Sequence, residues 1–399
     1  MASVLDRRRL LVGASALGLA GCAKTVAPLP PAPTDYVPQL APIRARADRL
    51  FDMTVCLRPF RAAGPRLDTE MVGSTLVVHN YGHGGSGWSL SWGSGTIAVR
   101  KAMANGPKQV AVIGCGALGL TSAILAQEAG AQVTIYARDM LPYTRSARAT
   151  GSFTPDSRIA LTDVAAPGFG DLWEEMARIS FKTYRRYLGL PGNPVEWTDR
   201  YFLSDGPPPA PTPDPPGTLD FAYYRDRIAD LMPRSAELPP GSTPFPTTHV
   251  RRTSTMQFNI ADYGHTLLTD FFAAGGKFEQ REFHSMSEFA QLKEKIVINC
   301  PGYAARALCK DESVVPVRGQ IGWLIPQPEV NYGVQYEGVF VLARRDGIVV
   351  QAVDGGDMKG YNDDNETVDK AESVNAVAKI AKLYAGFDMS STKAFSRRA

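Results

Sequence analysis

Residues 110–119 read VAVIGCGALG and place three glycines directly after a run of apolar residues. The run 110–113 is rich in β-branched residues and predicts a strand buried on both faces. Residues 120–129 then have the pattern of a helix that Gly130 ends, and residues 133–136 predict a second strand. A strand, a glycine turn, a helix and a second strand form a unit that binds dinucleotides. The sequence therefore predicts an α/β fold with a Rossmann-like domain.

Each glycine of this turn has its own physical task. Gly114 permits the tight turn, Gly116 lets the backbone approach a pyrophosphate, and Gly119 allows the helix to pack closely on the strand. Ala117 and Leu118 begin the helix, where free N–H groups meet the phosphates at the positive end of the helix dipole. We therefore predict that these five residues bind the cofactor.

The residues after the second predicted strand leave the identity of the dinucleotide open. This position commonly holds an acid that hydrogen-bonds a ribose, but here it is Arg138, followed by Asp139. An arginine there can bind the 2′-phosphate of NADP. The glycine motif by itself is therefore compatible with FAD, NAD or NADP.

Length and composition indicate an ordinary globular protein. The chain has 399 residues, more than one hydrophobic core usually holds, so we expect two domains. Hydrophobic residues make up 44% and charged residues 21% of it. The net charge is +3 without a basic block, so nothing indicates a nucleic-acid partner. The five histidines show no metal-ligand spacing, and we expect no metal site.

The first residues have the layout of an export signal. Arg7, Arg8 and Arg9 precede an apolar run at residues 10–20, which is too short to span a bilayer as a helix. The arginine pair resembles the twin-arginine signal, and residues 19–22, LAGC, resemble a bacterial lipobox. We expect a signal peptide at 1–21, a lipidated Cys22 that anchors the protein in the periplasm, and a proline-rich tether at 22–48. The alternative is an uncleaved anchor.

A second glycine-rich run, residues 77–93, reads VVHNYGHGGSGWSLSWG. It closely resembles the C-terminal signature of D-amino acid and D-aspartate oxidases, HNYGHGGxGxTxxWG. Residues 57–68, which contain Arg58, resemble the segment of that family that holds the substrate carboxylate. Further similarities follow at residues 133–151, 258–260, 298–302 and 317–321. The resemblance implies FAD on a Rossmann-like domain, with a second α+β substrate domain.

The order of these parts departs from the family. The arginine segment and the HNYGHGG run normally come last, yet here they precede the strand at Val110. We therefore expect a circularly permuted chain, with its new ends between the helix near Lys382 and the strand near Val55. The alternative is that residues 50–105 are a fused remnant of a neighbouring copy. The expected division is an FAD-binding domain at 55–152 and 253–312, and a substrate domain at 153–252 and 313–388.

The resemblance also implies the substrate-binding residues. Arg58 would hold the substrate carboxylate through two parallel hydrogen bonds, and the backbone of Gly85 would accept from the substrate amine. Tyr332 and Tyr336 fall in the loop where the family places tyrosines over the substrate, although each is equally compatible with a partly buried strand residue. Phe340 stands where the family has its second tyrosine. His83 is expected to shape the loop rather than to act as a base.

The remaining expected FAD contacts come from segments far apart in the sequence. They are Thr144, Arg145, Ser146, Gly151 and Ser152 from one loop, Cys300 and Gly302 after a strand, and Gly84, Gly85, Ser86, Gly87, Trp88 and Ser89 from the second glycine-rich run.

The resemblance implies oxidative deamination of a D-amino acid to the 2-oxo acid and ammonia, with O2 reduced to H2O2 or a respiratory carrier as acceptor. Three alternatives stay open: oxidation of glycine or an N-methyl amino acid, a flavin-binding lipoprotein without activity, and an NADP-dependent reductase.

Periodicity predicts three further helices. They lie at residues 173–188, at 265–274 before Gly275, and after Asn365 as the N-cap of a helix that carries Val374 and Val377. The proline-rich stretch 205–217 predicts an exposed connection.

Overall fold

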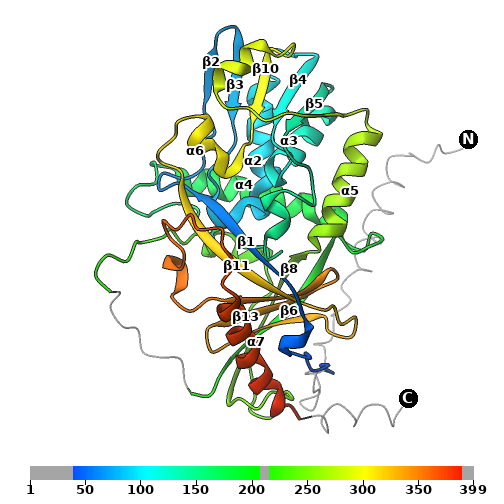
Figure 1. Ribbon diagram of the computed structural model, residues 1–399, viewed down its shortest axis with the longest axis vertical. Helices are drawn as coiled ribbons and strands as arrows, with labels where there is room; N and C mark the ends of the chain where they lie inside the picture. The colour runs from blue at the N-terminus through cyan, green and yellow to red at the C-terminus, as the bar shows by residue number, and fades with distance from the viewer. Residues whose placement is uncertain (1–38, 207–214, 389–399) are drawn as a thin grey trace, which may run out of the picture.

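The computed structural model describes residues 39–206 and 215–388, which form two mixed β-sheets with helices packed on them (Figure 1). The signal peptide, Cys22 and most of the tether lie outside the described residues, as does most of the proline-rich connection. No helix within residues 39–206 and 215–388 is both long and apolar enough to cross a membrane.

The first sheet has six strands in the order β2-β3-β10-β4-β5-β9. Their bounds are Thr69–Val72 (β2), Thr75–His79 (β3), Ile296–Asn299 (β10), Gln109–Ile113 (β4), Gln132–Ala137 (β5) and Lys277–Gln280 (β9). All neighbouring pairs are parallel except β2 and β3. The predicted strand, glycine turn, helix and second strand are confirmed as β4, α3 (Ala117–Glu128) and β5.

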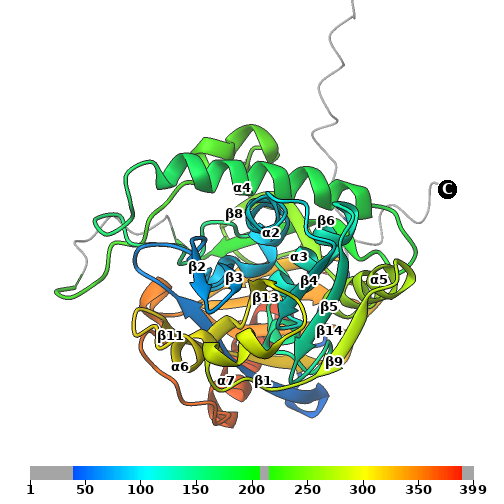
Figure 2. The ribbon, with the colours of Figure 1, turned by 90° about the horizontal axis from the view of Figure 1, so that it is seen from above.

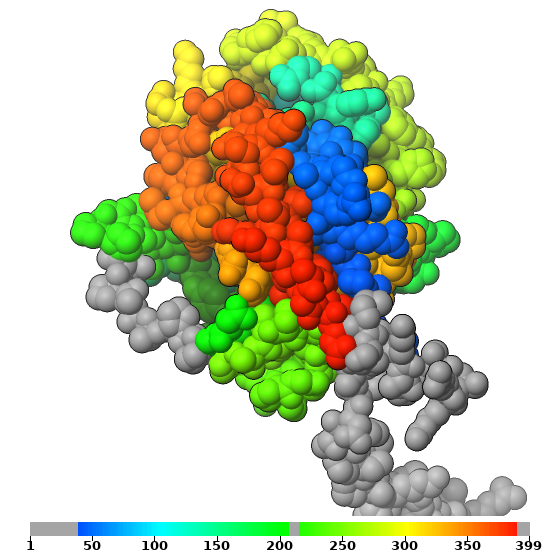
Figure 3. Space-filling model, turned by 60° about the horizontal axis from the view of Figure 1, so that its bottom comes forward, coloured from blue at the N-terminus to red at the C-terminus, as the bar shows by residue number. Residues whose placement is uncertain are grey.

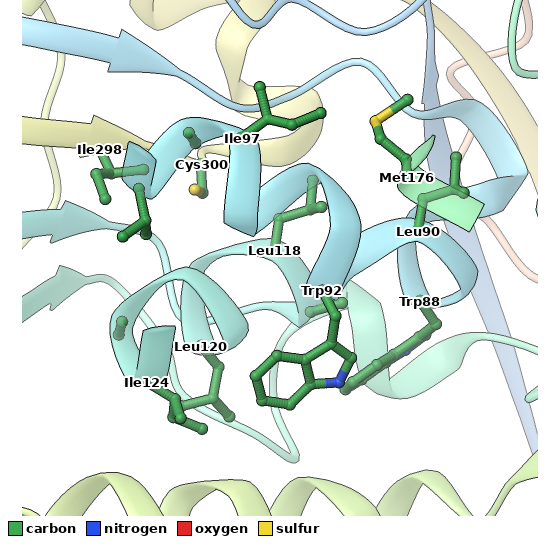
Figure 4. Close-up of a cluster of buried hydrophobic side chains, with 14 of the residues drawn as sticks. Trp88, Leu90, Trp92, Ile97, Leu118, Leu120, Ile124, Met176, Ile298 and Cys300 are labelled. Atoms are coloured by element: carbon green, nitrogen blue, oxygen red, sulfur yellow. The ribbon is translucent and has the colours of Figure 1, made fainter. Parts of the chain in front are cut away.

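Helices cover this sheet and form its core. Helix α2 (Gly87–Ala102) follows the second glycine-rich run and packs between α3 and α4 (Phe169–Tyr184) (Figure 2). Trp88, Leu90 and Trp92 of α2 join Leu120 of α3 and Met176 of α4 in one buried cluster (Figure 4). Because β3 and α2 are built into the same sheet and core as β4 and α3, residues 75–102 belong to this fold and not to a separate unit.

The second sheet has eight strands in the order β1-β11-β14-β13-β12-β6-β8-β7. Their bounds are Leu50–Phe60 (β1), Val315–Leu324 (β11), Gly347–Ala352 (β14), Val339–Arg344 (β13), Tyr332–Tyr336 (β12), Val195–Ser204 (β6), His249–Phe258 (β8) and Ala236–Leu238 (β7). Neighbouring pairs are antiparallel except β12 and β6. Helix α7 (Lys370–Ala385) packs on this sheet, while α5 (Ile260–Ala273) packs against α3 and the short α6 (Ala305–Leu308) follows β10.

Several sequence expectations differ from the observed elements. Strands β1 and β8 belong to the eight-stranded sheet, although residues 55–60 and 253–258 were expected in the FAD-binding domain. Helix α5 begins at Ile260, five residues before the expected start. Helix α7 is capped by Asp369, whose carboxylate accepts from the N–H of Glu372, and not by Asn365. Asn365 instead caps the turn before it, because its Oδ1 accepts from the N–H of Thr367.

The first and last described residues lie together. Ile43 and Ala45 share a buried cluster with Leu383 and Phe387 at the end of α7. Figure 3 shows the N-terminal segment of the described chain running beside the C-terminal helix. Val55 itself is not at an end: it lies inside β1, opposite Gln320, and is buried.

Candidate active site

A cavity of about 920 Å³ lies between the two sheets. One wall is made by the carboxyl ends of β4, β5 and β10, and the other by one face of the eight-stranded sheet. Ligands of α/β folds bind at the carboxyl ends of parallel strands. The cavity therefore joins a site suited to a dinucleotide to a second wall that can present side chains to a substrate.

The glycine turn after β4 is shaped by close backbone contacts. Gly114 has φ +96°, and a Cβ there would lie 2.4 Å from the carbonyl oxygen of Cys300. A Cβ on Gly119 would lie 2.0 Å from the carbonyl oxygen of Gly114. The turn thus needs glycine at both positions. Gly119 does not line the cavity, and this close contact gives it the packing role that we predicted for the third glycine.

The start of α3 is open to the cavity. Gly116 is its N-cap residue and offers no side-chain hydrogen bond, and a Cβ there would lie 2.7 Å from the hydroxyl of Ser146. Gly114, Gly116, Ala117 and Leu118 all line the cavity. A helix start with this backbone cradle fits a pyrophosphate, as predicted for a dinucleotide.

The structure also bears on the nucleotide at the end of β5. Arg138 lines the cavity, but its Nε donates to Asp139 at 2.8 Å and its Nη1 to Glu282 at 3.3 Å. Two carboxylates therefore neutralise the guanidinium that a 2′-phosphate would need. This pairing argues against NADP and shows a residue, Glu282, that no sequence motif indicated.

The loop 144–152 and the end of β10 supply most of the other predicted cofactor contacts. Thr144, Arg145, Ser146, Gly151, Ser152, Cys300 and Gly302 all line the cavity, together with Asp139. The loop is fixed by the indole N–H of Trp88, which donates to the carbonyl of Ser146 at 2.8 Å. Trp88, Gly84, Gly85 and Gly87 line the cavity as well.

Ser86 and Ser89 of the second glycine-rich run do not line the cavity. The hydroxyl of Ser86 donates to the carbonyl of Ser157 at 3.1 Å, and the hydroxyl of Ser89 accepts from the N–H of Thr154 at 2.8 Å. Their side chains point from the start of α2 to the loop that lies over it. These hydroxyls therefore fix the loop, and the role of Ser86 and Ser89 as flavin contacts stays a prediction.

His83 is buried beside the cavity in a neutral state. The Ser94 hydroxyl donates to Oδ1 of Asn80, so it must accept from Nε2 of His83, which lies 2.7 Å away. The other ring nitrogen, Nδ1, is consequently an acceptor, and it is buried without a hydrogen-bond partner. Burial lowers the pKa of His83 to about 3, with a further contribution from Arg61. A neutral, hydrogen-bonded ring agrees with the expected loop-shaping role.

Arg58 lies on β1 with its guanidinium in the cavity. Nη1 donates to the carbonyl oxygen of Arg318 at 3.2 Å, and no carboxylate within residues 39–206 and 215–388 forms an ion pair with it. Gly319 makes room for the guanidinium, because a Cβ there would lie 2.3 Å from Nη2. Burial lowers the pKa of Arg58, since the charged form is less well solvated there. An arginine in this state is suited to bind an anion.

Gly85 also lines the cavity, in the turn that packs next to β1, because the neighbouring His83 forms a β-bridge with Phe60. Its N–H donates to the carbonyl of Ser157 at 2.9 Å, so only its carbonyl remains for a substrate amine. A Cβ on Gly85 would lie 2.4 Å from the Ser157 hydroxyl, which explains why the loop has glycine at this position.

The structure does not place the two predicted tyrosines at the cavity. Tyr332 is buried, and its hydroxyl donates to the carbonyl of Ala41 at 2.6 Å and lies 2.9 Å from the hydroxyl of Tyr384. The hydroxyl of Tyr336 donates to Asp205 at 2.9 Å. Gln335 of the same strand points to the cavity. Tyr332 and Tyr336 point to the opposite face of β12, because neighbouring strand residues alternate between the two faces. A role for either tyrosine over the substrate is therefore corrected.

Other residues of the same strands line the cavity instead. Gln335 and Phe340 pair across β12 and β13, and Phe340 pairs with Gln351 on β14. Arg200 on β6 also lines the cavity. Sequence reasoning missed Arg200, Gln335 and Gln351, because alternation along these short strands did not fix which face each residue occupies.

Unpartnered buried polar atoms gather around this cavity. Within the described part of the chain, they include Nδ1 of His83, Oγ1 of Thr144, Nε of Arg145, and Nε and Nη2 of Arg200, all from lining residues. Buried polar groups normally have hydrogen-bond partners. The cavity therefore fits a large polar ligand, and FAD fits it through the glycine turn, the loop 144–152 and the second glycine-rich run.

Comparison with known proteins gives the same assignment. A family model described as FAD-dependent oxidoreductase, DAO, matches residues 109–396. The D-amino-acid oxidase of Rubrobacter xylanophilus is 30% identical over 211 residues, 53% of this chain and 57% of that protein. The D-amino-acid oxidase of Streptomyces coelicolor is 29% identical over 219 residues, 53% of this chain and 58% of that protein. The chain thus spans little more than half the length of these curated relatives.

Among solved structures, glycine oxidase from Geobacillus kaustophilus aligns with a TM-score of 0.45 at 11% identity, covering 70% of this chain and 78% of that one. The family model covers well over half of this chain, from β4 onward. The chain therefore belongs to the DAO family of FAD-dependent oxidoreductases, and its cofactor is FAD.

Proposed function

We propose that the protein is an FAD-dependent oxidase of D-amino acids that forms the 2-oxo acid, ammonia and H2O2 from the amino acid, water and O2. The observation that carries this proposal is Arg58, a guanidinium without a carboxylate ion pair among the described residues, which lines the same cavity as the predicted FAD-binding residues. Bound FAD supplies the acceptor for the hydride that leaves Cα of the substrate. The similarity to two bacterial D-amino-acid oxidases supports the choice of substrate.

The residues of the chain itself bind and orient the substrate. Arg58 offers a planar fork of N–H groups that matches a carboxylate in one pose. The Gly85 carbonyl would accept from the substrate amine, because the N–H of Gly85 is already bonded to Ser157. The neutral His83 is held by Ser94 and has no proton to give from Nδ1. The contribution of the protein is thus orientation of Cα, with the redox chemistry left to the cofactor.

The test is turnover by Arg58 variants. Removing one member of a buried charge pair costs about 2–5 kcal/mol, so Arg58→Ala should lower kcat/KM by roughly 30- to 4,000-fold. Arg58→Lys should fall between, because an ammonium keeps the charge but loses the fork. Flavin content should stay unchanged, and the exposed Arg46→Ala should behave as wild type.

The visible spectrum of the purified protein and its anaerobic bleaching provide the complementary readout. Bleaching by D- but not L-amino acids supports the proposal, whereas bleaching only by glycine or N-methyl amino acids would move the assignment to those amines. A flavin that no amine reduces would instead indicate a binding protein without activity. Wild-type turnover in Arg58→Ala would show that another residue holds the carboxylate.

We also propose that the chain is a circular permutant of its family. Strand β1 and the β3–α2 segment precede β4 in sequence, yet they complete the same two sheets that β4 to α7 form. The family model begins at residue 109, after these segments. The cluster that Ile43 and Ala45 share with Leu383 and Phe387 supports this proposal, because the chain of an unpermuted relative would run directly from α7 to β1 at this point.

The cellular location is a further proposal, resting on residues outside the described part. The arginine run, the short apolar segment and the LAGC motif support twin-arginine export and a lipid anchor on Cys22 in the periplasm. Export in the folded state suits an enzyme that must take up FAD first. O2 or a respiratory carrier would reoxidise the flavin there.

A further inference from the structure

Arg200 is a buried cation to which the proposed function assigns no role. It lies on β6, its residue is 7% exposed, and it lines the same cavity as Arg58. Its Nε and Nη2 are buried without hydrogen-bond partners, and no ion pair to it is found in residues 39–206 and 215–388. Taking a charge out of water without a partner costs several kcal/mol. This arrangement calls for an anion that the described chain does not supply.

The surroundings of Arg200 hold it in place without neutralising it. The guanidinium carbon lies 5.4 Å from the ring centroid of Phe340, so one face of the group rests on an aromatic ring. The charged side chain that acts on it electrostatically is another cation, Arg225, whose own partner is Asp156 at 2.8 Å. Burial and Arg225 lower the pKa of Arg200 to about 9. A guanidinium remains protonated at neutral pH, so the site keeps an uncompensated positive charge.

The register of the sheet gives the separation between the two cations. The guanidinium of Arg58 lies against Gly319 on β11, and that of Arg200 lies over Phe340 on β13. Only β14 stands between β11 and β13. Gly322 pairs with Val350 and Phe340 with Gln351, so Gly319 and Phe340 are also offset by about 7 Å along the strands. Together with two strand spacings of about 4.8 Å, this offset places the two groups roughly 12 Å apart. Charge-assisted hydrogen bonds of about 2.8 Å at each end then leave roughly 6 Å between the oxygens of two bound carboxylates.

A span of this size matches a short amino dicarboxylic acid. We propose that Arg200 binds a second anionic group, a carboxylate on the substrate side chain, while Arg58 binds the α-carboxylate. The protein would therefore prefer acidic amino acids of four or five carbons over their neutral amides. This inference rests on the proposed amino-acid oxidase function. It adds a specificity-determining residue and a substrate class to it.

Gln335 and Gln351 complete the wall between the cations. Both line the cavity, on the row of residues that crosses the sheet through Phe340. Their amides can donate to carboxylate oxygens that the two arginines leave free. This row of the sheet thus offers amide donors between the two arginines.

The first test measures binding without turnover. The FAD-loaded protein is titrated calorimetrically with succinate and glutarate, and with butyrate as the monocarboxylate of similar length. Wild type should bind the better dicarboxylate about 10- to 100-fold more tightly than butyrate, the range expected for one charge-assisted contact. Arg200→Met should reduce dicarboxylate affinity to the level of butyrate and leave butyrate binding unchanged. Arg252→Met, on the neighbouring strand β8 and outside the cavity lining, should behave as wild type.

The second test measures turnover on D-glutamate and D-aspartate against D-glutamine and D-asparagine. Wild type should favour the acids, and Arg200→Met should lose that preference while keeping activity on the amides. Equal binding of succinate and butyrate by wild type, or an unchanged ratio in Arg200→Met, would overturn the role of Arg200 and leave the oxidase function intact. Dicarboxylate binding that depends on Arg200 in a protein that oxidises no amino acid would support the site and reject the oxidase function.

Discussion

A Cβ atom on Gly319 would lie 2.3 Å from Nη2 of Arg58, so the guanidinium of Arg58 can take its position only because residue 319 has no side chain. Gly319 lies on β11 and pairs with Cys56 on β1, the strand that also carries Arg58. The clash would be with the far end of a flexible side chain, so the fold can tolerate alanine while the guanidinium has to move.

Gly319→Ala should therefore weaken substrate binding without loss of flavin. A displacement of about 1 Å at a positioning group can cost about 100-fold in rate, so we expect kcat/KM to fall by about 10- to 100-fold. Gly206→Ala is the control, because a Cβ there meets no atom within 4 Å. Steady-state kinetics and flavin absorbance of both variants check this, and an unchanged kcat/KM in Gly319→Ala would show that Arg58 does not depend on the space above Gly319.

A comparison of Gly114 with Gly130 distinguishes the role of a glycine in cofactor binding from its role in backbone conformation. Both have positive φ, +96° and +93°, so alanine costs about 1–2 kcal/mol of backbone strain at either. Only Gly114 also faces a backbone oxygen at 2.4 Å. Gly114→Ala should lose flavin, whereas Gly130→Ala should keep it with a modest loss of stability. Equal flavin occupancy in the two purified variants would contradict the cofactor role of the turn.

The buried His83 predicts an acid-dependent loss of stability. Its pKa is lowered to about 3 by burial in the folded protein, while an unfolded histidine titrates near about 6.5. The unfolded state therefore takes up a proton first as the pH falls. The stability that neutral His83 contributes is fully present above about pH 6.5 and is lost progressively toward pH 3, by at most about 1.4 kcal/mol per pH unit.

His83→Gln removes this titration while keeping an N–H donor for Ser94. Denaturant unfolding at pH 7, 6, 5 and 4 should show a steeper decrease in the free energy of unfolding for wild type than for the variant. Parallel pH profiles would mean that His83 is solvated or charged in the folded protein.

We expect FAD to be bound non-covalently. The cavity-lining thiols of Cys115 and Cys300 are buried, which raises the pKa of each to about 12, so neither is a thiolate at neutral pH. Precipitation with acid should release all yellow colour into the supernatant. Flavin that stays with the washed precipitate would be evidence of a covalent link.

The lipid anchor predicts a change of fraction in a single variant. Cys22→Ala should move the protein from the membrane fraction to the soluble fraction, because the buried acyl CH2 groups of an anchor are lost. Fractionation before and after a salt wash distinguishes an anchor from charge-based adsorption. A variant that still resists the salt wash would be held by another segment.

The sequence by itself determined the Rossmann-like unit and the family. The strand at 110–113 and the three glycines are local features, since a tight turn and a close backbone contact require glycine wherever they occur. The HNYGHGG run and Arg58 were identified by their resemblance to the family, and both line or support the cavity. Helix ends were less certain, as Asn365 and Asp369 show, because both residue types cap helices and turns.

Only the tertiary structure decided which residues of the eight-stranded sheet face the substrate. Tyr332 and Arg200 lie in neighbouring strands, and a shift of one position in either strand would exchange the cavity face for the core face. Pairing of β12 with β6 and β13 fixed that register, burying Tyr332 against α7 and leaving Arg200 in the cavity. The partners of Arg138 were likewise set by β9 and the residues after it, which lie far away in sequence but next to β5 in the sheet.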